Sequence, residues 1–171
     1  MKLSRLALLA AAAIAVAAIS VYVWNPFSVP SWDPRARVLG VIPYRVPSAS
    51  MSPTLSAGDF VLACTVSRSD VRVGDIVVFL GPPELEVAYL KRVLALGGDT
   101  VEFADSDFLL NGVRVREPYL QPGQTYDASG ALRVPSGTVF VAGDNRDHSV
   151  DSRHFGPVAL GSIIGKVCAG V

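Results

Sequence analysis

The sequence is poor in the residues that build cross-linked or metal-held scaffolds, because its 171 residues include only two cysteines and two histidines. Two cysteines are too few for a disulfide framework, and Cys64 and Cys168 lack the spacing of a zinc site. His148 and His154 lack the carboxylate spacing of zinc ligands, and the serine and lysine chemistry considered below needs no metal or organic cofactor. Charge is also balanced, with 15 basic and 15 acidic residues. A chain without a basic surplus has no electrostatic footprint for nucleic acid, so we expect no nucleic-acid partner.

The chain has no internal repeat, no coiled coil and no long amphipathic helix. It has 15 glycines, 12 prolines and many short Val-rich runs, which favour a turn-rich β protein over a helical one. Its length leaves room for one domain with an adequate core once the N-terminal segment is set aside. We therefore expect a mainly β fold, a compact antiparallel sheet, over residues 43–171.

Short apolar runs between turn residues define the expected strands. Asn111-Gly112 predicts a hairpin over 108–115, because this pair adopts the positive φ angles of a type I′ turn. The run 76–80 is continuously apolar and suits a strand buried on both faces. Residues 121–130 are polar and rich in turn formers, so a surface loop is expected there. The remaining strands are expected at 59–66, 86–96, 138–142 and 162–167.

Both cysteines lie in apolar runs, and free cysteine is among the most buried residue types, so buried thiols are the expectation. A disulfide between Cys64 and Cys168 would be permitted in an exported domain. The sequence does not show whether the two residues lie close together.

Residues 6–24 form an uncharged run of nineteen residues, long enough to cross a bilayer as a helix. Lys2 and Arg5 precede the run, so residues 1–25 are expected to be a cytoplasmic tip and a single membrane-spanning helix. A cleaved secretory signal peptide is the alternative, and either segment would export the rest of the chain. The prolines of residues 26–42 predict an extended connector to a domain outside the cytoplasm.

The polar block, residues 143–158, is dense in charged, hydroxyl and glycine residues within a chain that is otherwise half apolar. Such a cluster is either a solvated loop or a network that holds an active site. Two upstream segments favour the second interpretation: Pro-Ser-Ala-Ser-Met-Ser-Pro-Thr-Leu at 47–55, called the Ser50 segment, and Tyr-Leu-Lys-Arg-Val at 89–93.

A serine hydroxyl is a weak nucleophile until a base within hydrogen-bond reach takes its proton. Ser50 lies between Pro47 and Pro53, in a stretch that can be neither regular helix nor central strand, although many such serines are ordinary loop residues. Lys91 lies in an apolar strand, where burial would lower its pKa and leave a neutral amine that can act as a base. The alternative is a lysine on an edge strand whose amine reaches solvent.

Histidine could be the base instead, in a Ser50–His148–Asp151 triad, because triads are recognised by geometry and not by chain order. There is no Gly-x-Ser-x-Gly motif, which argues against an α/β-hydrolase.

The Ser50 segment, Lys91-Arg92 and the Gly-Asp-Asn-Arg-Asp-x-Ser-x-Asp-Ser-Arg pattern of the polar block, in this order, resemble type I signal peptidases. These are membrane-bound enzymes that remove signal peptides from exported proteins. The resemblance covers about residues 43–168 and implies any accessory β region to be small, within about 100–136.

The resemblance also implies roles for individual residues. Ser50 would be the nucleophile and Lys91 the base, while the Ser48 hydroxyl and the Ser50 backbone N–H would form the oxyanion hole. Ser149 would orient the lysine amine. The residues expected to build supporting salt bridges are Arg92, Asp144, Arg146, Asp151 and Arg153.

The function implied is cleavage of signal peptides after small-x-small sites, such as Ala-x-Ala, by an enzyme held in the plasma (inner) membrane. Its expected partners are preprotein signal peptides and the lipid bilayer, and no oligomeric state is indicated. One alternative is a specialised peptidase of the same chemistry, of a conjugative-pilin or organelle inner-membrane type. Another is a membrane-tethered β module that binds peptides without cleaving them.

Overall fold

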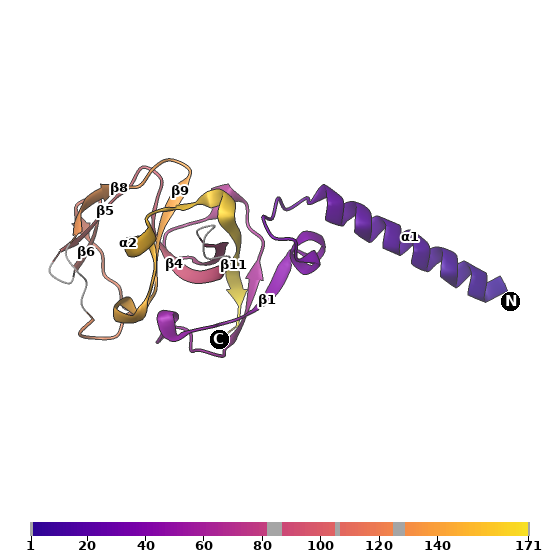
Figure 1. Ribbon diagram of the computed structural model, residues 1–171, viewed down its shortest axis with the longest axis horizontal. Coiled ribbons are helices and arrows are strands. Elements are labelled where there is room, and N and C mark those ends of the chain that lie inside the picture. The colour runs from indigo at the N-terminus through magenta and orange to yellow at the C-terminus, as the bar shows by residue number, and fades with distance from the viewer. Residues whose placement is uncertain (1, 82–86, 105–106, 125–128, 171) are drawn as a thin grey trace.

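The computed structural model describes residues 2–81, 87–104, 107–124 and 129–170, which form one long helix and two antiparallel sheets (Figure 1). The long helix is α1 (Lys2–Trp24), and a one-turn helix, α2 (Ser152–Phe155), lies much later in the chain. The strands are β1 (Val41–Arg45), β2 (Phe60–Cys64), β3 (Ile76–Leu80), β4 (Ala88–Leu96), β5 (Thr100–Ala104), β6 (Asp107–Leu110), β7 (Val113–Arg114), β8 (Ser129–Arg133), β9 (Thr138–Ala142), β10 (Val158–Ala159) and β11 (Ile163–Ala169). The expected mainly β, antiparallel fold after one apolar helix is confirmed.

The larger sheet has the strand order β1-β2-β11-β3-β4-β9-β10. The last strand, β11, lies between β2 and β3, so the end of the chain is built into the interior of the sheet. β3 has the expected bounds, and its successive residues Val77 and Val78 belong to different apolar clusters. Because side chains alternate along a strand, both faces of β3 are covered, as its continuous apolar run predicted.

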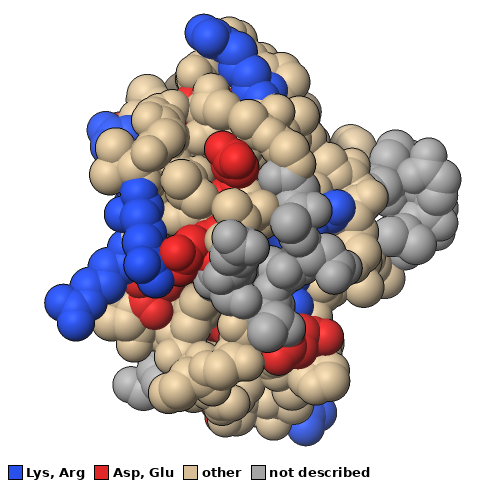
Figure 2. Space-filling view, turned by 90° about the vertical axis from the view of Figure 1, so that its left-hand side faces the viewer, with Lys and Arg blue, Asp and Glu red and all other residues tan. Residues whose placement is uncertain are grey.

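The smaller, four-stranded sheet has the order β7-β6-β5-β8 and spans 100–133, inside the stretch where an accessory β region was expected. Asn111 and Gly112 have φ angles of 54° and 77°, as a type I′ turn requires. The expected loop over 121–130 is wrong at its end, because β8 begins at Ser129 and pairs with β5. Pairing with a distant strand overrides the local turn signal there; residues 125–128 of that expectation lie outside the described part. Figure 2 views this end of the molecule and shows basic and acidic side chains mixed on it.

α1 projects away from the β domain, with the N terminus at its far end (Figure 1). Within it, residues Arg5–Trp24 have a mean hydropathy of 2.5 and are not buried inside the structure. The helix ends where Asn25 takes a positive φ of 49° and Pro26 comes next, since proline cannot continue a helix. Length and composition suit a membrane span, and an N-terminal signal sequence would share both.

The connector is extended only in part: it ends in the first residues of β1, but a helical turn interrupts it. Pro34 precedes a π-helical turn at Arg35–Leu39, because proline is pre-organised to begin a helix. Arg37 is buried in this turn, with its guanidinium 4.1 Å from the centre of the Trp32 ring and 5.2 Å from that of Tyr22. This stacking ties the connector to the end of α1.

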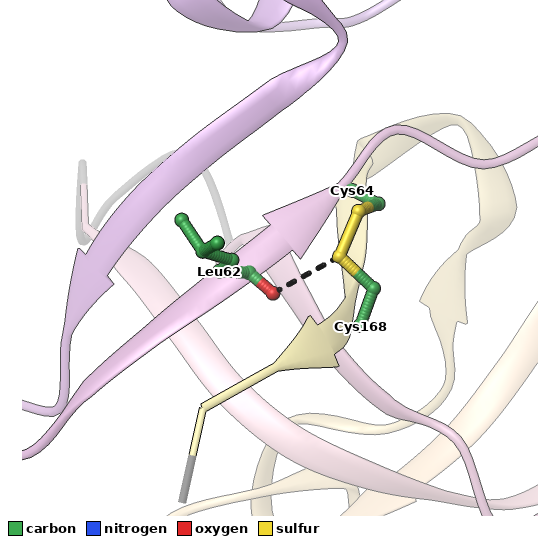
Figure 3. The surroundings of a disulfide bond; sticks show 3 residues. All are labelled: Leu62, Cys64 and Cys168. Carbon is green, nitrogen blue, oxygen red and sulfur yellow. Dashed lines mark hydrogen bonds between the residues drawn. A yellow bond between two sulfur atoms is a disulfide. The ribbon is translucent and has the colours of Figure 1, made fainter.

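Cys64 and Cys168 form a disulfide between neighbouring strands β2 and β11, so the expectation of buried thiols is wrong (Figure 3). The two Cα atoms lie 5.8 Å apart, within the range that a disulfide needs. Cys168 is exposed, and its sulfur lies 3.4 Å from the carbonyl oxygen of Leu62. The pairing depends on β11 lying beside β2, which local sequence does not reveal.

Candidate active site

Ser50 lies in a single 3-10 turn, Ala49–Met51, that comes after β1. Pro47 and Pro53 flank this turn and keep the Ser50 segment out of regular helix and central strand. Backbone N–H groups in the first turn of such a helix have no partner within it, so they are available to other acceptors. Ser50 is buried, with 8% of its surface exposed. The turn therefore presents one hydroxyl to the interior.

Lys91 lies in β4, opposite Val77 of β3, and 4% of its surface is exposed. Its Nζ atom is 2.6 Å from Ser50 Oγ, within hydrogen-bond distance. Burial lowers the pKa of Lys91 to about 8, although the charges of Asp151 and Asp144 oppose the decrease; Arg153 adds to it. At pH 7 about a tenth of such an amine is neutral, against roughly one part in 3,000 at the ordinary pKa.

An open cleft of about 700 Å³ contains this pair. β3 pairs with one edge of β4, and β9 pairs with the other edge along Arg92–Leu96. Along Ala88–Lys91 that second edge has no strand partner among the described residues and borders the cleft. Tyr44 crosses the cleft, and its hydroxyl donates to the carbonyl oxygen of Ala88 at 2.8 Å. The residues lining the cleft are Tyr44, Val46, Pro47, Ser48, Ser50, Met51, Val87, Ala88, Tyr89, Leu90, Lys91, His148 and Val150. An extended peptide could pair with this edge while apolar side chains receive its residues.

Arg92, the next residue of β4, forms an ion pair on the other side of the strand. Its Nε and Nη2 atoms donate to the two carboxylate oxygens of Asp144 at 2.8 and 2.6 Å. Thr54 of the Ser50 segment donates to the same carboxylate at 2.5 Å. Asp144 is fully buried, so the pair joins β4, the Ser50 segment and the polar block.

Asp151 is the N-cap of α2 and is also fully buried. Its carboxylate accepts two hydrogen bonds of 2.9 Å from the Arg153 side chain and one of 2.9 Å from the backbone N–H of Gly143. Burial alone would raise the pKa of Asp151, but the hydrogen bonds and charge of Arg153 hold it below its ordinary value. The carboxylate therefore stays charged and fixes the turn at Gly143.

Arg146 finds its carboxylate partner outside the polar block, in Glu117. Two hydrogen bonds of 3.0 and 2.5 Å join the side chains, which are 0% and 5% exposed. Tyr119 donates to Glu117 at 2.5 Å, and its ring lies 4.0 Å from the Arg92 guanidinium carbon. Sequence analysis missed Glu117, Tyr119 and Thr54, because one sequence contains no signal that pairs residues so far apart.

Gly143 lies close to two serines, Ser149 and Ser50. A Cβ atom there would overlap with Ser149 Oγ and with the carbonyl oxygen of Ser50. Ser149 Oγ is buried and does not bond to Lys91 in this structure, although it lies close enough to Asp151 to help lower the pKa of that carboxyl. Ser48 Oγ lies 3.2 Å from Ser50 Oγ. Both hydroxyls expected near the nucleophile are therefore close to it.

The Ser50–His148–Asp151 triad is not formed. His148 lines the cleft but is exposed, and no hydrogen bond within the described part of the chain joins it to Ser50 or Asp151. Lys91 occupies the position beside Ser50 that the base would need, and Asp151 is bound to Arg153. His154 accepts from the Asp151 backbone N–H and completes a capping box. Among the described residues, no group of His, Cys, Asp and Glu could hold a metal ion.

The chain also matches known proteins in sequence and in structure. Residues 35–170 match the family described as signal peptidase, peptidase S26. Signal peptidase I V of Bacillus subtilis is 36% identical over 141 residues, 74% of this chain and 83% of that protein. Thylakoidal processing peptidase 1 of Arabidopsis thaliana is 38% identical over 136 residues, 72% of this chain and 40% of that protein. The crystal structure of a signal peptidase I from Enterococcus faecalis aligns with a TM-score of 0.52 and 32% identity, over 58% of this chain and 97% of that one.

Proposed function

The chain belongs to the signal peptidase family, peptidase S26, whose members are serine endopeptidases, and we propose that it cleaves signal peptides from exported preproteins by a Ser50–Lys91 acyl-enzyme mechanism. The observation that carries the proposal is the 2.6 Å contact between Ser50 Oγ and Lys91 Nζ, buried beside an open cleft. A peptide-binding module without catalysis would not need this pair, whereas a serine peptidase does.

The reaction begins with Lys91 as a neutral amine. The hydrogen bond then runs from the Ser50 hydroxyl to Nζ, and Lys91 takes the proton as Oγ bonds to the carbonyl carbon of the peptide. The carbonyl oxygen becomes negative, and the Ser48 hydroxyl and the Ser50 backbone N–H donate to it. Their support is the 3.2 Å contact between the two serine hydroxyls and the first-turn position of the Ser50 N–H.

When the tetrahedral intermediate collapses, the C–N bond breaks and Lys91 returns its proton to the leaving amine. The substrate is then an ester on Ser50. Water attacks the ester carbon and gives a proton to Lys91. The C–O bond to Ser50 then breaks, and Lys91 returns the proton to Ser50 Oγ. Ser149 is included as the residue that orients the amine, because its buried hydroxyl lies against Gly143, close to the Ser50 carbonyl oxygen.

The cleft supports recognition of an extended peptide with small residues one and three positions before the cut. The open edge at 88–91 offers backbone hydrogen bonds, which give affinity independent of sequence. Apolar side chains such as Met51, Leu90 and Val150 line the space into which alternate residues would point.

Membrane placement rests on α1 and the disulfide. We place α1 across the plasma membrane, with the N terminus in the cytoplasm and the β domain outside, facing the substrate and the bilayer surface. The Cys64–Cys168 disulfide supports this side, because disulfides persist in oxidising, extracytoplasmic compartments.

The test is cleavage of a purified preprotein with an Ala-x-Ala site by the full chain in detergent, using wild type, Ser50→Ala, Lys91→Ala and His148→Ala. Loss of cleavage in Ser50→Ala and Lys91→Ala alone would support the mechanism. His148→Ala is the matched control, because His148 lines the same cleft. If Lys91→Ala still cleaves while His148→Ala does not, the lysine mechanism is wrong. A panel of bacterial, pilin and thylakoid preproteins would separate general from specialised cleavage.

A further inference from the structure

The connection between β7 and β8 returns from the smaller sheet to the polar block. Among its described residues, Glu117 and Gln124 contact Arg146 of the polar block and Tyr119 contacts Arg92 of β4, and we name these side chains the accessory clamp. None of them is part of the Ser50–Lys91 pair or lines the cleft.

The first contact fixes Arg146. The Glu117 carboxylate holds its guanidinium through two hydrogen bonds, and Gln124 Oε1 accepts from its backbone N–H at 2.7 Å. Arg146 Nε then donates to the carbonyl oxygen of Gly143 at 2.9 Å. The clamp therefore orients the turn that lies against Ser50.

The second contact fixes Arg92. The Tyr119 ring covers the Arg92 guanidinium at 4.0 Å, and its hydroxyl is held by Glu117. The N–H groups of the same guanidinium donate to Asp144 and to the carbonyl oxygen of Gly74. A planar guanidinium stacked on a ring loses less freedom when it forms paired hydrogen bonds, so stacking favours the two-point contact with Asp144.

Both contacts lead to the reactive pair. The backbone N–H of Asn145 donates to the Ser50 carbonyl oxygen at 3.0 Å, and the Asn145 side chain donates to the Ala49 carbonyl oxygen at 3.2 Å. The charged groups that act on Lys91 are Asp151, Asp144 and Arg153, while Arg92 is next to it on β4 and His148 lines the same cleft.

We propose that Tyr119 and Glu117 are positioning residues for the Ser50–Lys91 pair, because they hold Arg92 against Asp144 and Arg146 against the Gly143 turn. Arg92, and not Lys91, then neutralises Asp144. This division limits the Asp144 charge that acts on Lys91 and opposes loss of the proton that burial favours. The inference rests on the proposed function, in which neutral Lys91 is the base.

Loss of the ring has a definite electrostatic consequence. In Tyr119→Leu, Arg92 becomes mobile and leaves more of the Asp144 charge acting on Lys91. A nearby negative charge favours the protonated amine, so the pKa of Lys91 rises. The acidic limb of kcat/KM then moves to higher pH, with an activity loss of about tenfold at pH 7 that shrinks toward pH 10. Tyr119→Phe keeps the ring and should shift the limb less.

The experiment measures kcat/KM from pH 6 to 10 for wild type, Tyr119→Leu, Tyr119→Phe and Arg114→Leu, with melting temperatures for each. Arg114 forms an exposed ion pair with Asp107 in the same small sheet and serves as the control. Titration of the Lys91 amine by NMR in each variant gives its pKa without any substrate. An upward shift in Tyr119→Leu, seen in both measurements and absent in Arg114→Leu, supports the inference.

A loss in Tyr119→Leu that is equal at every pH, with an unchanged Lys91 titration, would show that Tyr119 is only structural and would overturn the inference. If Tyr119→Leu does not fold, Tyr119→Phe decides: loss of the hydroxyl bond to Glu117 should move the Lys91 titration upward by a smaller amount, and an unmoved titration would overturn the inference. A Lys91 titration that shifts as expected in a chain that cleaves no preprotein would refute the proposed function and leave the clamp intact.

Discussion

Lys91 and Arg92 are consecutive cations on β4, yet the side chains have different partners and their pKa values move in opposite directions. Arg92 meets a buried carboxylate at 2.6 Å; burial would lower its pKa, but the hydrogen bonds to Asp144 outweigh burial and raise it. Lys91 Nζ lies 2.6 Å from a hydroxyl and forms no ion pair with a carboxylate among the described residues, and burial lowers its pKa to about 8. Burial acts on both cations, so burial alone does not explain why their pKa values move in opposite directions. The partner does, because a carboxylate holds the charge and a hydroxyl does not.

The strongest way to break this comparison is Lys91→Arg, which makes both positions guanidinium. A guanidinium does not lose its proton in proteins, so it cannot act as the base. We expect preprotein cleavage to fall by about 1,000-fold or more while the fold persists. Cleavage assays with circular dichroism check this, and near wild-type activity would remove Lys91 as the base.

A second variant, Asp144→Asn, removes the carboxylate from the Arg92 side. It leaves a buried guanidinium without its counter-charge, so we expect unfolding free energy to fall by about 3–5 kcal/mol. Asp144 also raises the pKa of Lys91, so its loss should move the acidic limb of kcat/KM to lower pH. Urea denaturation and a pH profile test the two effects; an upward movement of the limb would contradict the electrostatic account.

A third change, Lys91→Met, tests what the unpartnered amine costs. A folded-state pKa of about 8 against 10.5 in the unfolded chain destabilises the protein by about 3 kcal/mol below pH 8. That cost diminishes as pH rises from 8 to 10.5, because over this range only the unfolded chain binds the proton. The Met variant should therefore be more stable at pH 7 but not at pH 10.5, and equal stability at both would contradict the assigned shift.

The smallest effect on the pKa of Lys91 is expected when the disulfide is removed in the double variant Cys64→Ser, Cys168→Ser. The bond closes a loop of 104 residues, so its loss should cost about 2–4 kcal/mol of stability. It lies away from the residues that act on Lys91, and the pH profile should not move. Melting curves measure the loss of stability, and kcat/KM profiles measure the position of the acidic limb. A shifted limb would show that destabilisation alone changes the titration of Lys91.

Local patterns predicted the parts of the fold that depend on local physics. The apolar run at 76–80 predicted β3, and Asn111-Gly112 predicted its turn. β5 and β8 were missed as individual strands, because their pairing partners lie in the smaller sheet and local turn signals do not reveal that pairing.

The candidate site divides in the same way. The order of three motifs pointed to Ser50 and Lys91 through their resemblance to type I signal peptidases, since a serine between prolines or a lysine in a strand is by itself an ordinary structural residue. The partner of Arg146 was not predictable, since Glu117 lies 29 positions earlier and no local pattern joins them. The cysteines were misjudged for the same reason: their distance depends on where β11 inserts.

The sequence by itself determined the apolar N-terminal helix and the β character of the domain, because hydropathy and turn chemistry are local properties, and its motifs indicated Ser50 and Lys91 as candidates. Only the tertiary structure decided that Lys91 meets Ser50, that Arg92 meets Asp144 and that the accessory clamp closes on the polar block. A pKa and an ion pair depend on burial and on neighbours brought from distant positions, and those arise only when the strands pair.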